Sequence, residues 1–173
     1  MAFSLYDATV ANYIQILGAV CGFLDKGMTH LRENGIDPAE ILETRLTSDM
    51  LPFRFQIVMV AYHSRGAMES AKTGLRTPPS YDPNLDFTGL RKMVTEARNE
   101  LSGLKREAVN ALSGGEVTFT LRDHILRFTT EDFLMSFALP NFYFHAVTAY
   151  DILRLKGAPI GKLDYMGKLR VKD

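Results

Sequence analysis

The sequence lacks the cysteines needed for an internal disulfide, and it lacks any net charge. Cys21 is the single cysteine among 173 residues, so the chain fits a reducing compartment. Twenty basic residues balance twenty acidic ones, which leaves no electrostatic footprint for nucleic acid or for an anionic membrane surface. We therefore expect small molecules or other protein chains as partners, with neither nucleic acid nor a membrane among them.

Long apolar runs are also missing. The first residues, MAFSLYDATVANY, lack the basic flank and apolar stretch of a signal peptide. No window approaches the roughly 20 apolar residues of a membrane span. These absences predict a soluble, cytoplasmic protein. A length of 173 residues fits one sizeable core, so we expect a single domain over residues 1–173.

Sequence motifs of familiar enzymes do not occur. The chain contains no GxSxG, HExxH or CxxC motif and no phosphate-binding loop. The hydrolase, kinase and redox-enzyme classes that these motifs identify therefore have no support. Function must instead be inferred from side chains that the fold brings together.

Helical periodicity dominates what is present. Apolar residues recur every three or four positions behind Ser4 and Asp7, which have the spacing of a capping box, until residues 34–35 end the run. A short helix is expected over residues 37–44, where an aspartate cap precedes a proline. A second long helix is expected over residues 52–74.

A proline-rich stretch separates the second long helix from the third. Residues 75–87 hold three prolines, so we expect no regular element there. A loop of about thirteen residues stretches to roughly 43 Å, which is enough to return along a helix of roughly 33 Å. The third helix, expected over residues 88–112 with a break at 102–103, can therefore run parallel to the second.

The hydrophobic period changes from about 3.6 to 2 after the glycines at 114–115. Apolar and polar residues alternate over 117–128, with a turn expected at 122–123, and this pattern predicts a small β-hairpin. Residues 129–130 cap the last helix, which Pro140 is expected to kink. The whole pattern predicts an all-α fold: a four-helix bundle with a long crossover between the second and third helices and a β-hairpin before the last helix.

Two of the four histidines are predicted to meet in the bundle interior. His63 shares its helix face with apolar residues, and His145 shares one with Asn141. If their helices run in opposite directions, each histidine lies roughly 16 Å from the same end of the bundle. The two rings should therefore lie at one level. His30 lies nearer a rim and His124 falls in the hairpin, so we expect both outside this layer.

Imidazoles at one depth on facing helices can bind a divalent transition metal such as zinc, nickel or iron. A catalytic zinc uses three protein ligands, so a third would have to come from Asn141, Tyr62, Tyr143 or a carboxylate such as Asp25. The alternative is that both histidines are neutral core groups, hydrogen-bonded to tyrosine or backbone. The tyrosines either line a pocket or pack with their hydroxyls at its rim.

Several segments resemble a known bacterial family. SLYDATV near the start, GIDPAEILETRLTSDMLPF after the first long helix and ALPNFYFHAVTAYDILRLKGAPIGKLDYMG at the end resemble a family of unknown function in the DinB/YfiT-like metalloenzyme superfamily. The resemblance covers nearly the whole chain and is specific around residues 140–145. It implies a DinB-like four-helix bundle with a long crossover between the second and third helices.

The resemblance also implies a metal site in the core. Proteins of the wider superfamily hold a divalent metal with one histidine from the second helix and two from an HxxxH pair on the last helix. His63 matches the first position and His145 the second histidine of the pair, while Asn141 stands where the pair's first histidine belongs. The site is therefore expected to be degenerate: His63 and His145 bind metal with Asn141 as a weak ligand, or no metal binds.

Two functions are compatible with the resemblance. Some relatives are thiol-dependent transferases or isomerases, in which a metal activates a low-molecular-weight thiol, and here Tyr62 or Tyr143 would donate a proton. The alternative is a non-enzymatic structural or small-molecule-binding bundle in which the histidines serve in packing. We expect a homodimer.

Overall fold

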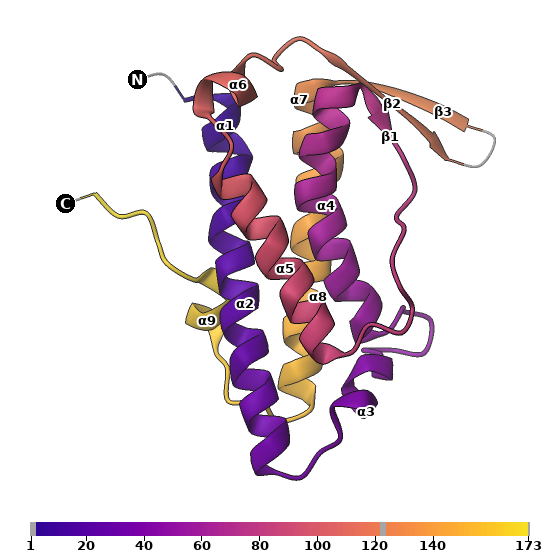
Figure 1. Cartoon of the computed structure of the whole chain (residues 1–173), viewed down its shortest axis with the longest axis vertical. Helices are drawn as coiled ribbons and strands as arrows, with labels where there is room; N and C mark the ends of the chain where they lie inside the picture. The colour runs from indigo at the N-terminus through magenta and orange to yellow at the C-terminus, as the bar shows by residue number, and fades with distance from the viewer. Residues whose placement is uncertain (1–2, 122–123, 173) are drawn as a thin grey trace.

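Four long helices packed side by side form the body of the protein (Figure 1). The computed structural model describes residues 3–121 and 124–172. Within these residues, α2 and α8 run in one direction and α4 and α5 in the other (Figure 1). The bounds of the four are α2 (Val10–Glu33), α4 (Phe53–Thr73), α5 (Phe87–Ser102) and α8 (Leu139–Leu155).

Shorter elements surround the long helices. The helical ones are α1 (Leu5–Ala8), α3 (Pro38–Glu43), α6 (Arg106–Asn110), α7 (Thr130–Asp132), the π-helix η1 (Phe133–Ala138) and α9 (Lys162–Met166). The strands are β1 (Leu75–Arg76), β2 (Glu116–Leu121) and β3 (His124–Thr129). The strands lie together at the end of the molecule where α4 ends (Figure 1).

Side-chain caps explain where several helices begin. The hydroxyl of Ser4 accepts a hydrogen bond from the backbone N–H of Asp7, as the capping-box spacing predicts. The carboxylate of Asp37 caps α3 in the same way, and Thr129 caps α7. The first long helix differs from the prediction because it is divided at Thr9, whose backbone leaves the helical conformation.

The protein is mostly helical, as expected, and its small sheet has one strand, β1, beyond the predicted hairpin. The β2–β3 hairpin is antiparallel, as predicted, and the turn expected at 122–123 lies outside the described residues. The prediction that residues 75–87 contain no regular element is wrong, because Leu75 and Arg76 pair in parallel with β2. That pairing joins segments far apart in the sequence, so no local pattern could indicate it.

The connection from β1 to α5 returns along α4 to the opposite end of the molecule (Figure 1). Helix α5 therefore runs parallel to α4, as the length of the crossover predicted. Ahead of Pro140, residues Phe133–Ala138 form η1, a π-helical segment, while the kink expected at Pro140 stays a prediction. Because proline offers no backbone N–H, the preceding turn cannot complete the regular α-helical hydrogen bonds.

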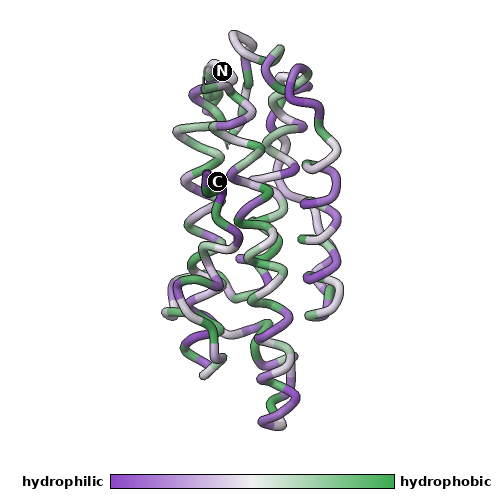
Figure 2. The backbone as a smooth tube through the Cα atoms, turned by 90° about the vertical axis from the view of Figure 1, so that its left-hand side faces the viewer, coloured by the Kyte–Doolittle hydropathy of each residue, from purple (hydrophilic) through white to green (hydrophobic). Residues whose placement is uncertain are grey.

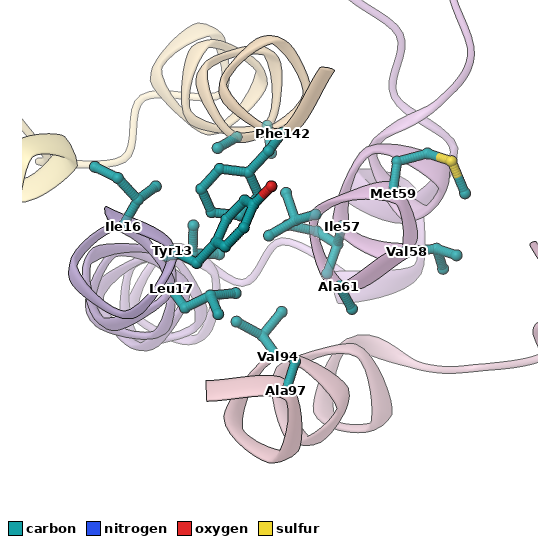
Figure 3. Close-up of a cluster of buried hydrophobic side chains, with 14 of the residues drawn as sticks. Tyr13, Ile16, Leu17, Ile57, Val58, Met59, Ala61, Val94, Ala97 and Phe142 are labelled. Carbon is teal, nitrogen blue, oxygen red and sulfur yellow. The ribbon is translucent and has the colours of Figure 1, made fainter. Parts of the chain in front are cut away.

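The core lies where the four long helices face one another. Figure 3 shows Tyr13 from α2, Ile57 from α4, Val94 from α5 and Phe142 from α8 meeting in one cluster. The rings of Tyr13 and Phe142 meet edge to face, with centroids 4.9 Å apart. Hydrophobic and hydrophilic residues alternate along the helices (Figure 2), as expected for helices with one buried face.

One helical stretch, Leu5–Glu33, is long and apolar enough to cross a membrane by length and composition alone. The sequence expectation that no window approaches a membrane span is therefore not met. However, 61% of the most apolar window is buried inside the fold. A core helix of a soluble protein passes the same test, and we interpret the stretch as such a helix.

Candidate functional site

His63 on α4 and His145 on α8 lie face to face at one level of the molecule. Their ring centroids are 5.6 Å apart and the ring planes differ by 16°. His63 is almost fully buried, whereas His145 is half-buried. The sequence-based prediction that these two histidines meet is confirmed.

Aromatic rings enclose the histidine pair. Each presents an edge to an imidazole, with centroid distances between 5.0 and 6.0 Å: Tyr62 and Phe137 beside His63, and Phe55 and Phe144 beside His145. Such apolar surroundings disfavour a charged imidazolium. Burial lowers the pKa of His145 to about 4. Burial, the positive charge of Arg76 and the neighbouring ring of His145 together lower the pKa of His63 to about 3.

Gln56 fixes the proton position on His145. The amide N–H of Gln56 donates to the backbone carbonyl of Leu51 at 2.7 Å, which leaves Oε1 as the acceptor that faces His145. Oε1 lies 2.7 Å from Nδ1 of His145, so Nδ1 must carry the proton. Because the ring is neutral, its Nε2 then holds a free lone pair.

Arg76 fixes the opposite arrangement on His63. A guanidinium only donates hydrogen bonds, and Nη2 of Arg76 lies 3.3 Å from Nδ1 of His63. Nδ1 therefore accepts, and the neutral ring carries its proton on Nε2. The two histidines thus offer one Nε2–H donor and one Nε2 acceptor. Neither Nε2 has a hydrogen-bond partner within residues 3–121 and 124–172, and neither atom is sealed from solvent.

The other predicted site residues lie around this pair or away from it. The Tyr62 hydroxyl donates to the Thr77 carbonyl, and burial raises the pKa of this hydroxyl. Asn141 lies one turn from His145, but its amide donates to the Phe137 carbonyl at 2.7 Å.

Tyr143 projects from nearly the opposite side of α8, because two residues turn a helix by about 200°. Burial raises the pKa of the Tyr143 hydroxyl, and the charge of Arg170 opposes this shift. The structure therefore places Tyr62 beside the histidine pair and Tyr143 beside the C-terminal segment.

The remaining histidines, His30 and His124, lie away from the pair. Nε2 of His30 bonds the carbonyl of Lys156 at the end of α8 at 3.1 Å, and its Nδ1 bonds Asn34. His124 is exposed on β3. Both lie outside the histidine layer, as the sequence predicts.

Sequence reasoning missed Gln56 and Arg76. Gln56 lies seven residues before His63 and therefore on the same helix face, which is a signal that could have found it. Arg76 follows the end of α4 and reaches the core only through the pairing of β1 with β2. No spacing in the sequence indicates its place.

A divalent metal does not fit this hydrogen-bonded arrangement. His145 offers a lone pair, but Nε2 of His63 is protonated while Arg76 occupies Nδ1. A dication bound to Nε2 of His63 would lie roughly 7 Å from the Arg76 guanidinium. At that distance the two charges repel by about 5 kcal/mol at an effective dielectric constant of about 20. Among the residues that the structure describes, no group of three or more histidine, cysteine, aspartate or glutamate side chains could hold a metal ion.

The fold of the chain is DinB-like. The chain is similar to the crystal structure of a DinB family member protein from Shewanella denitrificans, with a TM-score of 0.82 and 27% sequence identity over 98% of this chain and 95% of that one. Residues 5–166 match the family described as "Domain of unknown function (DUF1993)". The chain belongs to this family. A comparison with curated proteins found no match.

Proposed function

We propose that the protein binds a small molecule at the histidine pair, within a DinB-like four-helix bundle. The observation that supports this proposal is the opposite polarity of the two rings: His63 presents a donor and His145 an acceptor. A hydroxyl or a primary amide can accept from one and donate to the other. A purely apolar molecule would leave both nitrogens unpaired, which costs about 1–3 kcal/mol per buried group.

The aromatic surroundings favour a ligand with an apolar body. The ring edges of Phe55 and Phe144 stand beside His145, which is the more accessible of the two histidines. Half of the surface of Phe144 remains exposed, at 52%. An aromatic or aliphatic body could cover this surface while its polar group reaches the rings.

The pKa values favour binding over proton abstraction. His145 has a pKa of about 4, whereas a free thiol has one of about 8.5. Moving a proton from a thiol to His145 would cost about 6 kcal/mol at about 1.4 kcal/mol per pKa unit. The thiol-dependent transferase activity implied by the family resemblance therefore depends on a bound metal and stays a prediction.

Binding of zinc, nickel or iron by His63, His145 and Asn141 requires the Arg76–His63 hydrogen bond to break. Tag-free protein should therefore take up less than about a tenth of an equivalent of zinc or nickel when the ions are titrated in. Uptake near one equivalent, with loss of the His63 resonance pattern described below, would favour the metal centre and overturn our proposal.

The test is a long-range proton–nitrogen correlation spectrum of the imidazole rings at pH 7. We expect His63 protonated at Nε2 and His145 protonated at Nδ1. Benzyl alcohol should then shift the Nε2 resonances of both rings, whereas toluene, which has the same shape without a hydroxyl, should not. His63→Asn and His145→Asn should each abolish the response to benzyl alcohol. Each asparagine can keep the hydrogen bond that Nδ1 makes to Arg76 or to Gln56, but it lacks the Nε2 group that would bind the hydroxyl.

Equal responses to the two probes, or the same tautomer on both rings, would refute the proposal. In that case the remaining interpretation is a non-enzymatic bundle whose histidines serve in packing. The homodimer predicted from sequence is a separate proposal, and sedimentation velocity at micromolar concentration tests it. A monomer would reject the dimer without bearing on the ligand.

A further inference from the structure

Arg76 is buried, and no carboxylate among the described residues pairs with it. It is 2% exposed, and none of the ion pairs among the described residues includes it. Its hydrogen-bond partners are neutral: the Tyr62 carbonyl at 3.2 Å, the Ser70 hydroxyl at 3.5 Å and Nδ1 of His63 at 3.3 Å. Burial lowers the pKa of Arg76 to about 10, so the guanidinium still carries its charge at neutral pH. A buried charge of this kind is costly unless something pairs with it.

The guanidinium has donors to spare. Nη1 makes two of the three hydrogen bonds and Nη2 makes one, whereas Nε has no partner in the part of the chain that the structure describes. Nε and Nη2 form one edge of the group, and a carboxylate can bind such an edge with both oxygens. An acceptor at this edge would therefore satisfy Nε, which has no partner among the described residues.

A pocket of about 500 Å³ adjoins Arg76 between α4 and the start of the crossover. Gly66 lines it beside the guanidinium, since a Cβ at this position would lie 3.4 Å from Nη1 of Arg76. Tyr62 covers the guanidinium, whose central carbon lies 3.4 Å from the ring centroid. One hydrogen bond, from the Tyr62 hydroxyl to the Thr77 carbonyl, holds this ring to the crossover. A ligand that reaches the guanidinium past this ring would have to break that bond and tilt Tyr62 away from Arg76 and His63.

We propose that this pocket binds a small monocarboxylate, whose charge pairs with Arg76 when Tyr62 tilts aside. The proposal goes beyond the histidine pair, since it requires neither Nε2 group.

The charge of the pocket favours a monoanion over a phosphate dianion. Among the described residues that line it, Arg76 and Glu69 carry the charges, so the lining is neutral overall. Glu69 is mostly exposed and repels a second negative charge. Leu75, Pro78 and Pro79 add an apolar wall, which suits the body of an organic acid better than an inorganic ion.

The experiment titrates the whole protein with sodium benzoate at constant ionic strength. NMR follows the Nε–H resonance of Arg76, and calorimetry measures the affinity. Sodium phosphate, sodium chloride and benzamide serve as comparison probes. We expect saturable binding of benzoate, a shift of the Nε–H resonance and weaker or no binding of the other three.

Glu69→Gln should tighten benzoate binding by about threefold, the factor for removing one like charge roughly 8 Å away at a dielectric constant of about 60. The matched control is Glu96→Gln on α5, which removes an exposed carboxylate that, like Glu69, pairs with a lysine of its own helix, and it should leave the affinity unchanged because Glu96 does not line the pocket. Arg76→Met should abolish binding. If that variant does not fold, the Glu69 and Glu96 variants still decide the question.

Benzamide binding as tightly as benzoate, or no shift at the Nε–H resonance, would overturn the proposal and leave an internal water as the partner of Arg76. Tighter binding of phosphate than of benzoate would overturn the ligand class. The benzyl alcohol experiment reports on Nε2 of the histidines, so either proposal can fail while the other stands.

Discussion

Acidification from pH 7 to pH 5 should destabilise the fold through His63 and His145. Both are neutral and enclosed in the folded state, with pKa values of about 3 and about 4. In the unfolded chain both return to an ordinary pKa of about 6.5. The unfolded state therefore takes up protons first, and stability is lost as the pH falls below about 6.5 toward the folded-state values.

The size of this loss follows from proton linkage. At pH 5 the unfolded chain holds nearly one proton on each of the two rings, whereas the folded protein holds almost none. At 1.36 kcal/mol per pKa unit, the difference between pH 7 and pH 5 is about 2 kcal/mol for each histidine and about 4 kcal/mol for the pair. That is a large share of the 5–15 kcal/mol by which domains are typically stable.

Urea unfolding at both pH values measures this loss. The double variant His63→Asn/His145→Asn isolates it, because each asparagine can keep the inner hydrogen bond, to Arg76 or to Gln56, without taking up a proton. Its loss of stability over this range should be about 4 kcal/mol smaller than that of the wild type. His124→Asn is the control, because the exposed His124 should not change the slope. Equal pH dependence of the wild type and the double variant would refute the reasoning.

Three further predictions concern stability, and urea unfolding at pH 7 measures each. Tyr13→Phe should stabilise the protein by about 1 kcal/mol, since the buried hydroxyl has no partner among residues 3–121 and 124–172; destabilisation would reveal one. Asp37→Ala should cost about 1 kcal/mol by removing the cap from α3, and a neutral result would contradict the 2.9 Å bond to the Ala39 N–H. Gly74→Ala should cost about 1–2 kcal/mol, because φ is +73° and the new Cβ would lie 3.3 Å from the Glu116 carbonyl; an unchanged midpoint would argue against this backbone conformation.

The helices could be predicted because their signals are local. The cap at Asp37, the glycine stop at Gly74 and the 3.6-residue period each depend on neighbours within one turn or two. The meeting of His63 and His145 could also be predicted, since helix geometry converts residue number into height.

The hydrogen bonds that define the site could not be predicted. Which nitrogen of each histidine carries the proton depends on Gln56 and Arg76, and the place of Arg76 depends on the long-range pairing of β1 with β2. Asn141 was expected at the metal position, yet in the structure its amide bonds the backbone of its own helix. Spacing identifies which helix face a side chain shares, but competition with nearby backbone carbonyls decides where its polar group goes.

The parallel pairing of β1 with β2 sets the order in which the chain can assemble this site during translation. Arg76 leaves the ribosome together with the end of α4, but its strand partners, Thr118 and Phe119, follow about forty residues later. Until they emerge, a nascent chain can form α2 and α4 while the guanidinium stays in water. Burial of the Arg76 charge, which costs free energy, therefore occurs only after β2 has emerged and can pair with β1.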